Sequence, residues 1–263
     1  MKKAIRYILL TVCVCVFCYS AYNLINIYLN YKKIDDDYGE LAKTYTEEKE
    51  EKESYLQINW DELLQRNKDV KAWIQIPNTN VNYPVLQGET NDTYIHSDID
   101  HNELSAGSIF IASENEDPFN DFNTVIYGHN MKNGSMFNNI KSYTDQSFAD
   151  EHPYVYIYLP DGTVSQYKVV VGHIISEISS LYGTNNDMDK SSFIQEMVKT
   201  SSIKVDFDQS QVQSVITLST CTSAGSESGK RNVVHAILQR KGIDPVKEKM
   251  ENGSMSIVEG LKR

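Results

Sequence analysis

The chain has 263 residues, of which 40% are hydrophobic and 23% charged, and its net charge at pH 7 is −11. This composition is ordinary for a globular protein and excludes a wholly disordered or collagen-like chain. Residues 34–263 carry 20 basic against 36 acidic side chains, and so acidic a surface would repel phosphate backbones, which argues against nucleic-acid binding.

A charge-free segment near the amino terminus predicts a membrane-spanning helix. Residues 7–31 contain no charged side chain, and about 20 apolar residues suffice for a helix to cross a bilayer. Lys2, Lys3 and Arg6 precede this segment, and the positive-inside tendency places that end in the cytoplasm. We therefore expect residues 1–33 to be an uncleaved signal-anchor that crosses the cell membrane once, with the rest of the chain extracytoplasmic.

Two other interpretations of this segment stay open. A cleaved signal peptide has the same basic start but ends in a small-x-small cleavage site, which Ser20-Ala21, flanked by Tyr19 and Tyr22, matches poorly. The other alternative is a buried core helix.

The placement of the four cysteines fits an exported domain. Cys13, Cys15 and Cys18 lie in the apolar segment, where they serve as small hydrophobic side chains or lipid-attachment sites. Cys221 is then the single cysteine of the exported part, which can form no internal disulfide. A lone extracellular thiol is prone to oxidation, so its presence suggests that Cys221 does chemistry; a buried, inert cysteine is the alternative.

The exported part is predicted to comprise a stalk, a domain and an extension. Residues 34–57 are dominated by Asp, Glu, Lys and Tyr and predict a solvated, charged stalk or helix. A short helix is expected after Asn59, which can cap it, with Glu62 three positions later. We expect the domain to span residues 58–240, and we assign no role to the carboxy-terminal extension, residues 241–263.

The domain has the pattern of a strand-rich fold. Runs of β-branched and aromatic residues, separated by turn signals such as Asp161-Gly162, predict about eight strands. The expected strands are residues 72–77, 81–86, 107–112, 124–128, 154–159, 164–177, 212–219 and 232–239. Apolar residues at helical spacing predict helices within residues 136–150 and 191–201. The expected fold class is mainly β with added helices, a closed or nearly closed β-barrel.

Three short segments carry the candidate chemistry. The β-branched strand of residues 215–220 delivers Cys221 at its end, and the apolar strand of residues 125–127 is followed by Gly128 and His129. Arg231 lies where a loop enters the next strand. An imidazole can lower the pKa of a thiol or take its proton, and a guanidinium can stabilise the negative oxygen of an acyl-transfer intermediate.

The residues alone select weakly among the candidates. His129 is favoured because strand ends often carry functional residues, but His235 shares a strand face with Arg231 and stays a competitor. Arg231 by itself would more often be a solvated surface charge. The remaining histidines are His96, His101, His152 and His173. The acidic residues Asp98, Asp100 and Glu103 lack metal-ligand spacing and indicate a solvated acidic loop.

The sequence resembles the sortases, and among them class B. Thr217-Leu218-Ser219-Thr220-Cys221 fits the family's Thr-Leu-x-Thr-Cys, and an arginine follows ten residues later at Arg231. Tyr127-Gly128-His129-Asn130-Met131 supplies the histidine, in the family order His, Cys, Arg. The resemblance covers about residues 58–240, and the helix-bearing insertion at residues 178–210 points to class B.

The resemblance implies a closed eight-stranded sortase-type β-barrel and a cysteine transpeptidase of the Gram-positive cell wall. Such enzymes cleave a carboxy-terminal sorting motif on an exported protein, hold the acyl fragment as a thioester, and transfer it to an amine of peptidoglycan or its lipid-linked precursor. Cys221 would be the nucleophile, His129 the general acid/base and Arg231 the stabiliser of the oxyanion. No cofactor or metal is implied. The implied substrate-binding residues are Asn82, Leu86, Tyr182 and Ser219.

Two functions of other classes remain as alternatives. One is a different extracytoplasmic thiol enzyme, such as an L,D-transpeptidase or a papain-like peptidase, although the local signatures of these enzymes around the cysteine are absent. The other is a membrane-anchored binding module without catalysis, in which Cys221 is merely buried.

Overall fold

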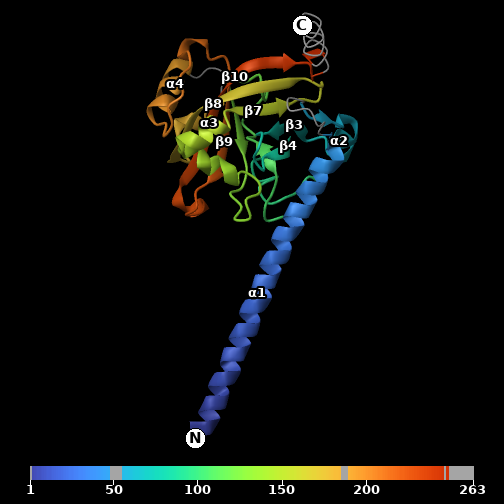
Figure 1. Cartoon of the computed structure of the whole chain (residues 1–263), viewed down its shortest axis with the longest axis vertical. Helices are drawn as coiled ribbons and strands as arrows, with labels where there is room; N and C mark the ends of the chain where they lie inside the picture. The colour runs from blue at the N-terminus through green and yellow to red at the C-terminus, as the bar shows by residue number, and fades with distance from the viewer. Residues whose placement is uncertain (1, 48–54, 185–188, 246, 249–263) are drawn as a thin grey trace, which may run out of the picture. The chain divides into compact units, whose positions relative to one another are not determined.

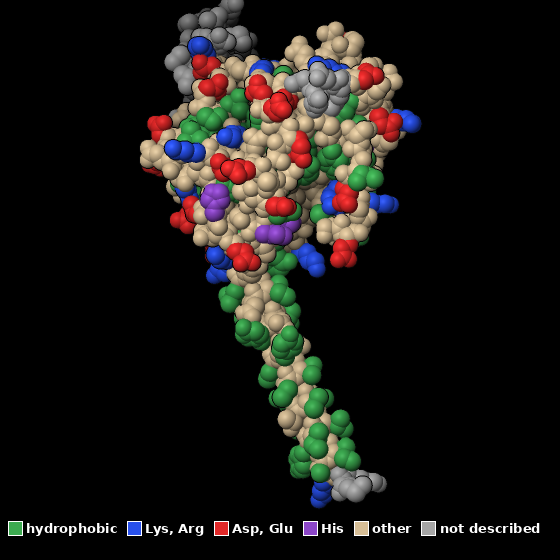
Figure 2. All heavy atoms as spheres, turned by 180° about the vertical axis from the view of Figure 1, so that it is seen from behind, with side chains coloured by type: hydrophobic (Ala, Val, Ile, Leu, Met, Phe, Trp, Pro, Cys, Tyr) green, Lys and Arg blue, Asp and Glu red, His purple; other side chains and the backbone are tan. Residues whose placement is uncertain are grey.

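The amino-terminal helix is longer than the predicted anchor. The computed structural model describes residues 2–47, 55–184, 189–245 and 247–248, and these fall into two compact units divided between Glu40 and Leu41. Helix α1 runs from Lys2 to Tyr45 without a break and is apolar enough over its first part to cross a membrane (Figure 1). Apolar side chains surround this part of the helix (Figure 2).

The segment predicted as a solvated stalk is only partly exposed to solvent. The helix continues to Tyr45, and its last turns hold the strong helix formers Glu40, Leu41, Ala42 and Lys43. Leu41 and Tyr45, which belong to the second unit, are buried, so the prediction of solvation is wrong at these positions. Strand β1 (Thr46–Glu47) then pairs antiparallel with β2 (Gln57–Ile58), and the charged run of residues 48–54 lies outside the described residues.

The short helix α2 (Trp60–Arg66) begins where its capping residue predicts. The Asn59 side-chain oxygen accepts a hydrogen bond from the Glu62 backbone N–H at 3.4 Å, which satisfies one of the unpaired donors of the first turn. Leu63 is fully buried and fastens the helix to the domain.

Among the described residues, eight strands close into a barrel, which confirms the predicted fold class. Their order around the barrel is β10-β8-β7-β3-β4-β5-β6-β9, and neighbours are antiparallel except for the parallel pairs β4–β5 and β6–β9. The strands are β3 (Val70–Gln75), β4 (Asn82–Leu86), β5 (Ile109–Ile111), β6 (Asn123–Tyr127), β7 (Tyr154–Tyr158), β8 (Val164–Ser176), β9 (Val215–Cys221) and β10 (Lys230–Ile243).

Short helices occupy the connections between strands. The segment predicted helical at residues 136–150 forms the 3₁₀-helix η1 (Asn138–Thr144) and α3 (Gln146–Glu151). Helix η1 crosses β8 at Gly172, where a Cβ atom would lie only 1.9 Å from the Tyr143 carbonyl oxygen. The remaining short helices are η2 (Ser180–Tyr182), α4 (Lys190–Lys199), η3 (Gln209–Gln211) and η4 (Ser226–Ser228).

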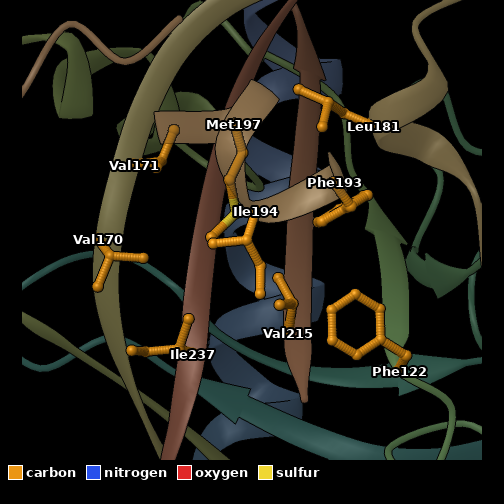
Figure 3. Close-up of a cluster of buried hydrophobic side chains, with 9 residues drawn as sticks. All are labelled: Phe122, Val170, Val171, Leu181, Phe193, Ile194, Met197, Val215 and Ile237. Atoms are coloured by element: carbon orange, nitrogen blue, oxygen red, sulfur yellow. The ribbon is translucent and has the colours of Figure 1, made fainter. Parts of the chain in front are cut away.

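The insertion between β8 and β9 packs on the barrel through its own apolar core. Helix α4 contributes Phe193, Ile194 and Met197, which meet buried side chains of the barrel strands and Leu181 of η2 (Figure 3). This burial holds η2, which ends at Tyr182, in a fixed position beside β9. The other members of the cluster are Phe122, Val170, Val171, Val215 and Ile237.

A chain of hydrogen-bonded polar side chains runs through the buried interior beside this core. Thr217 on β9 donates to Asn123 on β6 (2.7 Å) and contacts His235 Nδ1 on β10 (2.9 Å). His235 Nε2 lies 3.1 Å from His173 Nε2 on β8, and His173 Nδ1 lies 3.0 Å from the Thr200 hydroxyl after α4.

The partners determine where the protons of this chain lie. Because Thr217 donates to Asn123, its oxygen accepts from His235 Nδ1–H, which leaves His235 Nε2 to accept from His173 Nε2–H. His235 is therefore neutral. Burial lowers the pKa of His173 to about 4, and burial followed by repulsion from His173 lowers the pKa of His235 well below its usual value.

We expect this buried pair to make the domain sensitive to acid. A histidine whose pKa is lower in the folded state binds fewer protons than it does unfolded, so the free energy of unfolding falls as pH drops below about 6.5. For His173 alone the loss between pH 7 and pH 5 is about 2 kcal/mol. Urea unfolding of the purified chain at the two pH values measures it. His173→Gln should flatten the pH dependence, while exposed His101→Gln should not. A stability equal at both pH values in the unmodified chain would contradict this assignment.

Candidate functional site

The pairing of three strands brings His129, Cys221 and Arg231 to one end of the barrel. In the parallel pair β6–β9, Tyr127 lies opposite Ser219, and the Gly128 N–H donates to the Ser219 carbonyl at 3.2 Å. His129 and Cys221 each stand two residues beyond that pair. In the antiparallel pair β9–β10, Arg231 lies directly opposite Cys221.

These three residues line one pocket with a cavity volume of about 380 Å³. Tyr182 and Ser219, two of the residues predicted to bind substrate, line the same pocket. Cys221 is half-buried at its wall and not sealed in the core. A thiol that a ligand can reach, beside an imidazole and a guanidinium, has the groups needed for nucleophilic acyl transfer.

The immediate surroundings of His129 fix its protonation. Its Nε2 lies 2.6 Å from the Ile95 carbonyl oxygen, and since a carbonyl only accepts, Nε2 carries the proton and Nδ1 is the basic nitrogen. The His96 ring stacks on it at 5.5 Å between centroids. Burial, opposed by the Ile95 hydrogen bond and aided by His96, lowers the pKa of His129 below its usual value. At neutral pH His129 is thus a neutral base.

Gly128 allows the loop of His129 to lie close to the core. A Cβ atom at this position would lie 2.4 Å from the Ile109 side chain and 2.8 Å from the ring of Phe137. Phe137 is fully buried and its N–H donates to the His129 carbonyl at 2.9 Å. A residue with a side chain at position 128 would displace this support of His129.

Arg231 is held in place and is not the solvated charge expected of a lone arginine. Its guanidinium forms an ion pair with Glu177, just after β8, and donates to the backbone carbonyls of Ser226 (3.3 Å) and Lys230 (3.0 Å). Its side chain is 19% exposed, and Glu177 lines the same pocket. The positive charge is therefore oriented beside Cys221 before any ligand binds.

Two of the four predicted substrate-binding residues form part of the pocket wall. The Tyr182 hydroxyl is hydrogen-bonded to the Ser219 Oγ at 2.8 Å, and the Tyr182 ring stacks on Tyr127 at 6.2 Å between centroids. Burial raises the pKa of Tyr182 to about 12, so its hydroxyl stays neutral. Ser219 lies two residues before Cys221 on β9, so Tyr182 and Ser219 form the pocket wall next to the cysteine.

The other two predicted residues, Asn82 and Leu86, lie elsewhere among the described residues. Leu86 is completely buried, so its side chain is not accessible to a ligand in this arrangement. The Asn82 side-chain oxygen accepts a hydrogen bond from Trp73 Nε1 at 2.6 Å, and Asn82 is outside the described lining of the pocket. Residues 83–86 of β4 are all buried, so the strand is covered on both faces at Leu86.

Two residues of the pocket, His96 and Glu177, were not predicted from the sequence, and His235, the competitor of His129, lies away from it. His235 is fully buried against Phe193 of α4 and does not reach the described pocket lining. His96 and Glu177, which were given no role from the sequence, both line the pocket. The register of β8 places Glu177 there, and the path of residues 91–96 places His96. In the described part of the chain no three acidic, histidine or cysteine side chains could hold a metal ion, and Asp100 instead pairs with Arg66 at 2.6 Å.

We expect the pKa of His129 to depend on the stacked imidazole of His96. In the unmodified chain the pKa of His129 should lie below 6.5, and His96→Ala should raise it, because a repulsive neighbour is lost and water enters. Histidine carbon shifts followed by NMR between pH 4 and pH 9 measure both values. His152→Ala, outside the pocket lining described above, is the control. A His129 pKa that His96→Ala leaves unchanged would show that the stack has no electrostatic effect.

Comparison with known proteins gives one consistent result. Residues 74–239 match the family model of the sortase domain. Sortase B of Staphylococcus aureus is 30% identical over 249 residues, which are 90% of this chain and 97% of that protein. Sortase B of Listeria monocytogenes is 32% identical over 188 residues, 68% of this chain and 74% of that protein. A solved Staphylococcus aureus sortase B–substrate complex matches with a TM-score of 0.68 and 28% identity, over 81% of this chain and 99% of that one.

Proposed function

The chain belongs to the sortase family and, within it, to class B, whose members are cysteine transpeptidases; from this premise we propose that it processes exported proteins at a carboxy-terminal sorting motif. The protein is cut within that motif and passed to an amine of peptidoglycan or of its lipid-linked precursor. The observation that carries the proposal is the single pocket that Cys221, His129 and Arg231 share. The similar Staphylococcus aureus structure is a complex of a sortase B with its substrate, which supports a peptide ligand for this fold.

The first half of the reaction forms a thioester. Cys221 Sγ attacks the scissile carbonyl carbon, and the thiol proton passes to Nδ1 of His129, the nitrogen that the Ile95 hydrogen bond leaves basic. The C–N bond then breaks, the leaving amine takes the proton from His129, and the acyl group stays on sulfur. In the second half the acceptor amine attacks the thioester and gives a proton to His129. The C–S bond then breaks, and the proton returns from His129 to the Cys221 sulfur.

Arg231 stabilises the oxygen that becomes negative in both halves. Its planar guanidinium offers several N–H donors in fixed directions, and the ion pair with Glu177 orients it before the substrate arrives. Orientation in advance matters because donors that must move during the reaction contribute less to the rate. Tyr182 and Ser219 form the adjoining wall, against which the bound peptide packs.

The apolar first part of α1 supports a place in the membrane. An apolar helix of this length and composition is compatible with a single crossing, and the basic residues before it favour the cytoplasm. We propose that the catalytic domain is held on the outer side of the membrane, where exported proteins and wall precursors both arrive.

We expect substitutions of the three residues to separate their roles. Cys221→Ala should abolish cleavage of a sorting peptide, because the covalent route is lost. His129→Ala should lower kcat by about 10²–10⁴-fold, as loss of a general acid–base does. Arg231→Lys should lower it by about 10²–10³-fold, because an ammonium cannot reproduce the planar donors. A fluorescence-quenched peptide assay on detergent-solubilised protein measures these rates, with melting temperatures to confirm folding. Full activity of folded Cys221→Ala would disprove the role of the thiol.

The buried histidine provides a contrasting substitution. His235→Ala should cost roughly 1–3 kcal/mol of the free energy of unfolding, because Thr217 and His173 each lose one of their buried hydrogen-bond partners. At a temperature where the variant is folded, kcat should stay within a few-fold of the unmodified value. If His235→Ala destroys turnover in a folded protein while His129→Ala is nearly silent, the assignment of the catalytic histidine is wrong.

We expect protease added to intact protoplasts to degrade the catalytic domain. The domain follows an apolar helix whose basic end stays in the cytoplasm, so it should be accessible from outside. Immunoblotting for the domain measures its loss, and a cytoplasmic protein that stays intact shows that the membrane is sealed. A domain that is digested only after detergent lysis would place it on the cytoplasmic side.

A further inference from the structure

The backbone hydrogen bonds between the strand that precedes His129 (β6) and the strand that ends at Cys221 (β9) stop before they reach the two residues. The last backbone hydrogen bond joins the Gly128 N–H to the Ser219 carbonyl, at 3.2 Å. The donors of one strand in a parallel pair recur at every second residue, so the next bond donated by the histidine strand would join the N–H of residue 130 to the carbonyl of Cys221. This is the bond that would tie the segment of His129 to the cysteine.

A side chain takes the place of this missing bond. The side-chain amide of Asn130 donates through Nδ2 to the Cys221 carbonyl at 3.0 Å. The backbone meanwhile turns away from β9: the Phe137 N–H donates to the His129 carbonyl, and Asn130 faces Met136 in an antiparallel bridge. The two strands therefore diverge at His129, where the pocket opens, yet remain connected through the Asn130 side chain.

The orientation of the Asn130 amide is itself fixed. Asn138 Nδ2 donates to Asn130 Oδ1 at 2.9 Å and to the Met131 carbonyl at 2.8 Å. Since Oδ1 of Asn130 accepts from Asn138, its Nδ2 is the group that faces Cys221. The amide is held at both ends and is half-buried. Because the side chain is held at both ends, it keeps the segment after β6 at a fixed distance from Cys221 on β9.

We propose that Asn130 is a positioning residue for the transpeptidation: its side chain holds the segment that carries His129 in register with Cys221 after the strands have diverged. The inference rests on the proposed roles of Cys221 and His129 in the reaction. Proton transfer between a thiol and an imidazole requires a short, aligned contact, and a displacement of about 1 Å can cost about 10²-fold in rate. Asn130 is not among the residues that line the pocket, and it acts through the two residues that it connects.

Asn232 provides a matched control on the same carbonyl. Its Nδ2 also donates to the Cys221 carbonyl, at 3.1 Å. It lies on β10, however, which is already paired with β9 through the backbone, with Asn232 opposite Thr220. Loss of the Asn232 amide removes a bond to Cys221 but leaves His129 connected to the cysteine strand. A comparison of the two asparagine variants therefore distinguishes the loss of a hydrogen bond to Cys221 from the loss of the connection between Cys221 and His129.

The test combines turnover with a measurement that needs no substrate. Asn130→Ala should lower kcat for a sorting peptide by about 10–100-fold with KM within about twofold, and Asn232→Ala should cost less than about fivefold. The second measurement is the rate at which iodoacetamide alkylates Cys221 at pH 7, followed at that residue by mass spectrometry. Asn130→Ala should slow it in the unmodified background and change it less than about twofold when His129→Ala is also present, because His129 is the residue it positions.

The outcomes are decisive in each case. An equal slowing by Asn130→Ala with and without His129 would overturn the proposal, and so would an equal loss in Asn232→Ala. Asn130→Asp keeps the acceptor for Asn138 and lacks the donor, so it should behave as Asn130→Ala does; failure of both variants to fold would make Asn130 a structural residue and overturn the proposal too. If the unmodified chain does not process a sorting peptide, the proposed function fails, while the alkylation rates still decide the role of Asn130.

Discussion

The parallel pairing of β6 and β9 is the constraint on which the site depends. Both strands point the same way, so the residues that follow them emerge at the same end of the barrel, His129 from one and Cys221 from the other. The antiparallel strand β10 then sets Arg231 opposite Cys221. Three residues that are 10 to 102 positions apart in sequence thereby share one pocket without any of them lying on a long free loop.

The surroundings of the pocket determine how this geometry is used. The carbonyl of Ile95 sets the tautomer of His129, and Glu177 orients Arg231, so protonation and charge are arranged before a ligand binds. On the other side, the apolar core under α4 and the polar chain that ends at Asn123 hold η2 against β9. Asn123 donates to the Gly183 carbonyl at 2.8 Å, directly after Tyr182. The insertion thus contributes Tyr182 to the pocket wall, and α4 packs on the barrel through buried apolar side chains.

The sequence allowed prediction of the features that depend on local patterns. The strands follow from β-branched runs and turn residues, and the start of α2 from Asn59, because each of these is decided within a few residues. The orientation of Leu86, the ion pair of Glu177 and the contact of Asn130 with Cys221 depend on strand register in the closed barrel, which joins residues up to 91 positions apart. Period-two alternation gave His235 a face shared with Arg231, but not that α4 covers this face, with Phe193 against His235.

The most direct test of the central claim is the mass of the chain after incubation with a sorting peptide and no acceptor amine. Because Cys221, His129 and Arg231 share one pocket, the account predicts an added mass equal to the acyl fragment, located on Cys221 and removed by hydroxylamine as a thioester is. Addition of an acceptor amine should discharge it into a new peptide product. Turnover of the peptide with no adduct on Cys221, or with an adduct on another residue, would contradict the account.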